Sequence, residues 1–140
     1  MTFDLQLTPE LILQAAKVMS SAPDTKIVLC HAGSPADRSE QGLEKWSRDL
    51  RLLSDMDNIF CKLSGLGMFD HNWTENSIAP IVNECLQQFG PSRCMFGSNF
   101  PVDSLYSDYS SLIKAYRNII PKLASETVFD KTARDFYKIH

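Results

Sequence analysis

Residues 26–31 of this 140-residue chain are Lys-Ile-Val-Leu-Cys-His (KIVLCH), a nearly continuous apolar run that contains two β-branched residues. Such a run is typical of a strand that is buried on both faces of a parallel sheet. Gly33 and Pro35 follow it and predict a loop. Apolar residues then recur on one stripe over about residues 41–54, which predicts a helix. This part of the chain is therefore a strand–loop–helix unit.

The same order of elements continues along the chain. Further strands are predicted over residues 2–7, 59–63 and 93–96. The remaining helices are expected over about residues 8–19, 76–89, 105–119 and 126–139. Four βα units imply an α/β fold with parallel strands, either as a small open sheet or as part of a (β/α)8 barrel. A barrel takes about 250 residues, so residues 1–140 are expected to form one partial-barrel domain, about half of a barrel.

Composition excludes several classes of protein. The net charge is −3, from 14 basic and 17 acidic residues, whereas a sequence-independent nucleic-acid binder needs clustered basic residues. No apolar run approaches the roughly 18 residues of a membrane-spanning helix, and the first ten residues do not resemble a signal peptide. The four cysteines form no C-x-x-C pair and are expected to be free thiols. We therefore expect a cytoplasmic protein without a nucleic-acid or membrane partner.

Polar residues follow three of the predicted strands. His31 ends the second strand, Ser64-Gly65 follows the third, and Ser98-Asn99 follows the fourth. In both candidate architectures, ligands bind at the carboxyl ends of parallel strands. Each residue alone has an ordinary structural interpretation, as a turn residue or a hydrogen-bonded side chain. Three such strand ends in series favour a functional site.

The alternation of side chains along a strand predicts which residues share a face. His31 is expected to face the barrel lumen together with Ile27 and Leu29. Lys62 lies in the middle of an apolar strand, where an unpaired ammonium group is costly. It is therefore predicted to face a polar lumen or to pair with a carboxylate such as Asp4, on a neighbouring strand.

Three motifs carry a resemblance to a known family. They are LCHAGSP at residues 29–35, CKLSGL at 61–66 and FGPSRCMFGSNFP at 89–101, followed by the ending ARDFY at 133–137. Together they resemble the amidohydrolase superfamily, in the branch that contains sugar-acid lactonases and 2-pyrone-4,6-dicarboxylate hydrolase. The family fold is a (β/α)8 barrel of about twice this length. The resemblance therefore implies the C-terminal half of a barrel, without the family's His-x-His motif.

The resemblance also implies roles for individual residues. His31 and Asn99 are the expected catalytic residues, and His31 is a metal ligand only if a metal is bound. Asn99 stands where most relatives have an aspartate, and an asparagine cannot take a proton at neutral pH. The expected substrate-binding residues are Lys62, Ser64, Gln6 and Asp103. No cofactor is expected in this chain alone, while the resemblance allows a divalent metal such as zinc in the full-length enzyme.

The expected function is hydrolysis of a small carbonyl substrate, most plausibly a lactone, once the barrel is complete. The alternatives are a non-catalytic half-barrel that folds with a partner chain and a small open-sheet binding domain. A divided barrel is expected to leave unpaired strand edges at residues 2–7 and 93–96 and to expose Ile27, Leu29 and Met95. Self-association, or association with the missing half, is therefore predicted.

Overall fold

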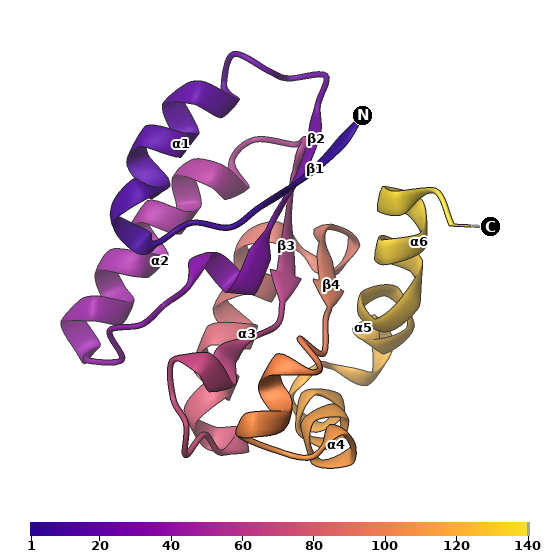
Figure 1. Ribbon diagram of the computed structural model, residues 1–140. Helices are drawn as coiled ribbons and strands as arrows, with labels where there is room; N and C mark the ends of the chain where they lie inside the picture. The colour runs from indigo at the N-terminus through magenta and orange to yellow at the C-terminus, as the bar shows by residue number, and fades with distance from the viewer. Residues whose placement is uncertain (140) are drawn as a thin grey trace.

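A computed structural model describes residues 1–139 of the chain, and four parallel strands form its single sheet (Figure 1). The strands are β1 (Thr2–Leu5), β2 (Lys26–Leu29), β3 (Ile59–Leu63) and β4 (Cys94–Phe96), and each pairs with its neighbours in chain order. Helices connect successive strands, as right-handed parallel crossovers require. The predicted α/β fold with parallel strands is confirmed.

The helices form two groups. Those that connect the strands are α1 (Ile12–Met19), α2 (Glu40–Ser54) and α3 (Glu75–Phe89). Those that follow β4 are α4 (Tyr109–Ile119), α5 (Lys122–Glu126) and α6 (Thr132–Tyr137), with the π-helical turn η6 (Thr127–Lys131) between α5 and α6. In Figure 1, α1, α2 and α3 lie on one side of the sheet, and α5 and α6 lie on the other side. The π-helical turn also interrupts the final helix that was predicted over residues 126–139, so only residues 132–137 of that range form the α-helix α6.

Side-chain caps determine where the longer helices begin. Ser39 Oγ accepts a hydrogen bond from the Gly42 backbone amide, and Thr74 forms a capping box with Ser77. Such caps satisfy backbone donors that have no partner within the helix. Asp108 caps α4 in the same way, so this helix begins after the cap and not at the predicted residue 105. Residues 102–105 instead form a separate 3-10 turn, η5 (Val102–Leu105).

The main hydrophobic core lies between the sheet and the connecting helices. Ile27 pairs in register with Ile59, and Leu29 pairs with Cys61; all four are buried in the cluster that includes residues of α2 and α3. The prediction that Ile27 and Leu29 face the lumen with His31 is therefore wrong. Their face of the sheet is the one that the helices cover, because apolar strand residues gain most from burial there.

The opposite face of the sheet carries a second, smaller core. Val28, Phe60 and Met95 point to this side, and Phe136 of α6 packs on them with no exposed surface. The Phe136 ring centroid lies 4.9 Å from that of Phe60 in an edge-on arrangement. The expected exposure of Ile27, Leu29 and Met95 is wrong, since all three are buried. The sequence pattern did not place α6 over this face.

The two outer strands differ in how well they are covered. Among the described residues 1–139, no strand lies beside the outer edge of β1, as predicted for residues 2–7. An apolar hollow of about 380 Å³ adjoins this strand, lined among others by Phe3, Leu5, Ala15 and Val18. Within residues 1–139 β4 pairs only with β3, so the predicted second unpaired edge at residues 93–96 is present, although η6 and α6 pack against this strand.

Two expectations from composition can be compared with the fold. All four cysteines are free thiols, and Cys61, Cys85 and Cys94 are buried between the sheet and α3. Cys94 Sγ donates to the Cys85 carbonyl oxygen at 3.5 Å. Among residues 1–139, no helix is both long enough and apolar enough to span a bilayer.

Candidate active site

The chain changes direction sharply where β2 ends. The strand stops at Leu29, and residues 31–34 have left-handed backbone conformations with φ between 52° and 71°. Such a conformation costs a non-glycine residue about 1–2 kcal/mol, and strain of this kind gathers at functional sites. The Trp46 indole donates a hydrogen bond of 2.8 Å to the Ala32 carbonyl oxygen and holds the turn in place. Because His31 lies beyond the strand, strand alternation does not determine its direction.

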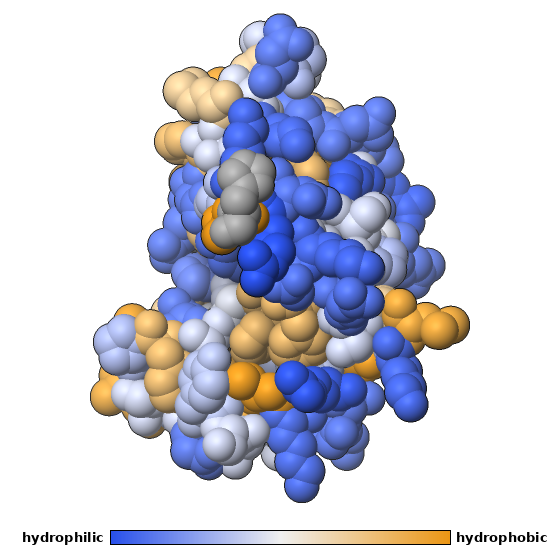
Figure 2. All heavy atoms as spheres, turned by 90° about the vertical axis from the view of Figure 1, so that its right-hand side faces the viewer, coloured by the Kyte–Doolittle hydropathy of each residue, from blue (hydrophilic) through white to orange (hydrophobic). Residues whose placement is uncertain are grey.

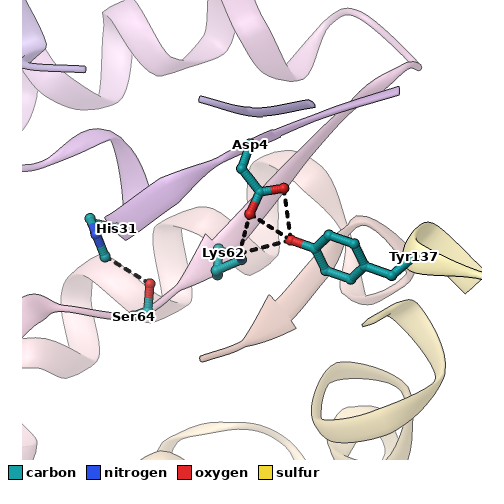
Figure 3. A network of polar contacts seen from close by, with 5 residues as sticks. All are labelled: Asp4, His31, Lys62, Ser64 and Tyr137. Carbon is teal, nitrogen blue, oxygen red and sulfur yellow. Dashed lines mark hydrogen bonds and ion pairs between the residues drawn. The ribbon is translucent and has the colours of Figure 1, made fainter. Parts of the chain in front are cut away.

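His31 and Ser64 meet at the ends of β2 and β3. His31 Nδ1 lies 2.9 Å from Ser64 Oγ (Figure 3). Gly65 has a φ of +64°, and a Cβ atom there would lie 2.5 Å from Nδ1, so the imidazole can approach only a glycine. Burial lowers the pKa of His31, which keeps the ring neutral at neutral pH.

Asn99 and Asp103 form a second pair beyond the end of β4. The Asn99 side-chain amide donates to Asp103 Oδ1 at 2.9 Å, and the Asp103 backbone amide donates to the Asn99 carbonyl oxygen at 3.0 Å. Asp103 is only 1% exposed, and this burial raises the pKa of its carboxyl group, although the hydrogen bond from Asn99 opposes the shift. The negative charge of Asp103 favours protonation of His31, so the two pairs act on one another.

Several buried polar atoms near these pairs have no hydrogen-bond partner. Within residues 1–139 they are Arg38 Nε and Nη1, Asp103 Oδ2 and Tyr116 Oη. Arg38 comes from the loop after β2, where its Nη2 donates to the Leu66 carbonyl oxygen at 3.3 Å. Buried polar groups are nearly always paired, so each exception needs a reason, such as a catalytic role. Arg38 and Tyr116 were not predicted; a charged residue in a strand-end loop was the available signal for Arg38.

Lys62 belongs to a separate network on the face of the sheet against which α6 packs (Figure 3). Its ammonium group lies 2.7 Å from Asp4 Oδ2 and 2.8 Å from the Tyr137 hydroxyl, which also donates to Asp4. Burial opposes the charged form, but these hydrogen bonds outweigh it and raise the pKa of Lys62. The predicted pairing with Asp4 is confirmed. Asp4 is not on the adjacent strand, however, because β2 lies between β1 and β3.

The predicted site residues therefore fall into three places. His31, Ser64, Asn99 and Asp103 lie together beyond the ends of β2, β3 and β4. The Lys62 ammonium group is engaged by Asp4 and Tyr137 and not by the His31–Ser64 pair. Gln6 is exposed just beyond β1.

The donor set around His31 does not match a zinc site. A catalytic zinc ion takes three protein ligands, usually histidine or carboxylate groups. In the part of the chain that the structure describes, no three histidine, cysteine, aspartate or glutamate side chains are grouped closely enough to hold a metal ion. The ring of His31 instead contacts the Ser64 hydroxyl. The described residues alone therefore do not supply the ligands of a catalytic zinc site.

Comparisons with known proteins give relatives of about twice this length. The chain is 35% identical over 142 residues to the uncharacterized protein y4mH of Sinorhizobium fredii, covering 99% of this chain and 48% of that protein. It is 36% identical over 104 residues to L-fucono-1,5-lactonase of Burkholderia multivorans, covering 64% of this chain and 35% of the lactonase. The chain thus spans about half, or less, of the relatives it matches.

Solved structures show the same relation. An amidohydrolase from Burkholderia multivorans, crystallised with bound zinc, superposes with a TM-score of 0.92 at 25% identity, over 99% of this chain and 53% of that one. A probable 2-pyrone-4,6-dicarboxylic acid hydrolase from Acinetobacter baumannii, 17% identical, shares the fold with a TM-score of 0.77 over 97% of this chain and 52% of its own. The four βα units correspond to about half of an amidohydrolase barrel. The amidohydrolase family model matches residues 1–139, so the chain belongs to the amidohydrolase family.

Proposed function

We propose that this chain carries part of the active site of a hydrolase that opens a small lactone of a sugar acid. The observation that carries the proposal is the placement of two side-chain pairs, His31–Ser64 and Asn99–Asp103, beyond the carboxyl ends of parallel strands. The similarity to L-fucono-1,5-lactonase supports the substrate class. Because the chain spans about half of its relatives, the full activity is proposed for a completed barrel.

In this proposal His31 polarises the lactone carbonyl. With Ser64 Oγ donating to Nδ1, the neutral ring carries its proton on Nε2 and donates it as a hydrogen bond to the carbonyl oxygen. The Asn99 amide oxygen orients the attacking water. The water oxygen forms a bond to the carbonyl carbon, the ring C–O bond breaks, and the proton of the water ends on the released hydroxyl group. The product is the open hydroxy acid.

Lys62 and Gln6 have secondary roles in the proposal. The ammonium group of Lys62 supplies positive charge on the sheet face next to Ser64, and it contacts an anionic substrate only when it leaves Asp4 or Tyr137. Gln6 is exposed beyond β1 and is free to reach a bound substrate from the side of that strand.

The direct test is proton release from sugar-acid 1,5-lactones by the chain within a completed barrel. We expect hydrolysis above the spontaneous rate with lactones, and no acceleration with an open-chain amide of the same acid. Circular dichroism of the same sample verifies that the chain is folded. A folded, completed barrel without any acceleration would contradict the proposal and would favour the non-catalytic alternative.

We further propose that the isolated chain self-associates through β1. Its outer edge presents unpaired backbone groups, and the adjoining hollow is lined by apolar side chains. A second copy is the simplest occupant, because two β1 edges can pair antiparallel about a two-fold axis, and this buries Phe3 and Val18 of both copies. β4 does not offer a comparable edge, since η6 and α6 pack on it.

Light scattering over a concentration series checks this assembly. We expect the apparent mass to rise from one chain to two with concentration, because both the edge and the hollow are exposed. Val18→Glu, which places a charge at a residue 72% exposed beside the hollow, should keep the chain monomeric. Leu123→Glu, at a fully exposed site away from β1, is the control and should dimerise normally. A wild-type monomer at every concentration would exclude the interface.

A further inference from the structure

The proposed reaction requires a proton acceptor, and the residues so far assigned do not provide one. The attacking water must lose a proton as its oxygen bonds to the carbonyl carbon. Asn99 cannot accept it, because an amide stays neutral and unprotonated near pH 7. His31 is engaged in donating to the carbonyl oxygen, and the Ser64 hydroxyl is engaged by His31. The acceptor must therefore be another group close to Asn99.

Asp103 is the carboxylate that adjoins Asn99. Two hydrogen bonds connect the residues, one from the Asn99 amide to Asp103 Oδ1 and one from the Asp103 backbone to the Asn99 carbonyl. The left-handed backbone of Asn99, with a φ of 57°, and the η5 turn bring residue 103 back toward residue 99. The carboxylate of Asp103 is thus held beside Asn99, the residue that follows β4.

The environment of Asp103 is unusual for a structural aspartate. The residue is almost completely buried, and its Oδ2 atom has no hydrogen-bond partner within the part of the chain that the structure describes. Buried carboxylates are almost always paired, because an unpaired charge in the interior is costly. Burial raises the pKa of this carboxyl group toward the range in which a general base works best. One oxygen atom therefore accepts a hydrogen bond from Asn99, while the other has no partner among residues 1–139.

We propose that Asp103 is the proton-accepting carboxylate of this site and that Asn99 positions the water between it and the substrate. This inference rests on the proposed function. As the water oxygen bonds to the carbonyl carbon, the proton passes to Asp103 Oδ2. When the ring C–O bond breaks, Asp103 returns that proton to the departing oxygen, which becomes the hydroxyl group of the product. The carboxylate ends the cycle in its starting form.

An exchange of the two side chains tests the assignment. Asp103→Asn removes the acceptor but keeps an oxygen that can accept from Asn99; it should lower kcat for lactone hydrolysis by about 10²-fold or more, with KM little changed. The double variant Asn99→Asp/Asp103→Asn retains one amide and one carboxylate in the pair. It should recover kcat to within about tenfold of the wild type. The acidic limb of its pH profile should move, because the new carboxylate lies in a different environment.

Asp108→Asn is the matched control. It removes the same charge five residues away, and asparagine still caps α4, so kcat should not change. Circular dichroism verifies the fold of each variant. If Asp103→Asn fails to fold, the exchanged pair decides the question, since it preserves the amide–carboxylate bond and reports through kcat and the pH profile.

The outcomes separate the two proposals. An active wild type whose Asp103→Asn variant keeps full kcat, or whose exchanged pair is no more active than Asp103→Asn, would overturn the role of Asp103 alone. A folded wild type that hydrolyses no lactone would overturn the proposed function and, with it, this role.

Discussion

Replacing His31 with alanine is expected to lower kcat/KM for lactone hydrolysis by at least about 10²-fold, the usual contribution of an acid–base or electrostatic group. The reason is geometric. His31 sits in a left-handed turn, with one ring nitrogen held by Ser64 and the imidazole packed on Gly65. This arrangement leaves the other nitrogen for the substrate. Initial rates over a range of lactone concentrations measure the effect.

His71→Ala is the control for this experiment. The ring of His71 stacks on Tyr106 at 4.4 Å between centroids, on an exposed stretch that contributes nothing to the proposed chemistry. Its removal should leave kcat/KM unchanged. Equal turnover by folded His31→Ala and wild-type chains would show that His31 does not contact the reacting groups.

Replacing Phe136 with alanine is expected to lower the free energy of unfolding by about 3–5 kcal/mol, as for other buried phenylalanines. Phe136 is fully buried against Val28, Phe60 and Met95, and it anchors α6 to the face of the sheet opposite the main core. Domains of this kind have a total stability of about 5–15 kcal/mol, so the variant should lie near the limit of folding. Urea unfolding followed by circular dichroism measures the change.

Leu123→Ala and Tyr137→Phe help to interpret that result. Leu123 is fully exposed, so its truncation should change stability by no more than about 0.5 kcal/mol. Tyr137→Phe keeps the ring and removes only the hydroxyl group that bonds Asp4 and Lys62. Hydrogen bonds to charged groups contribute about 1.5–3 kcal/mol, and this network is partly exposed. The free energy of unfolding should therefore fall by no more than about 3 kcal/mol. A Phe136→Ala variant as stable as Leu123→Ala would mean that α6 does not dock on the sheet.

The position of α6 also determines the character of that side of the molecule. Figure 2 shows this side, with mostly hydrophilic residues in its upper half and a hydrophobic area in its lower half. Val28 and Met95 lie beneath α6 and do not contribute an exposed patch. The expectation that a half-barrel exposes its inner face is therefore not met where α6 lies.

The sequence by itself determined the order and type of the elements. The strand predicted over residues 59–63 agrees with β3 at both ends, and the helices predicted over 41–54 and 76–89 agree within one residue. These predictions succeed because side-chain periodicity, caps and glycine–proline stops act within a few residues of one another. The polar residues at the strand ends could be predicted from the same local patterns. The pairing of Lys62 with Asp4 could be predicted because an unpaired charge in an apolar strand is costly.

Tertiary structure alone decided which face of the sheet each strand presents and what covers it. Alternation gives two faces but does not say which one the helices cover, so Ile27 and Leu29 were assigned to the wrong side. The contact of Tyr137 with Asp4 joins residues 133 positions apart, beyond any local pattern. The left-handed turn at His31 and the bond between Asn99 and Asp103 likewise depend on backbone conformation and packing. Such features result from the free energy of the whole fold, in which long-range burial and hydrogen bonding outweigh local preference.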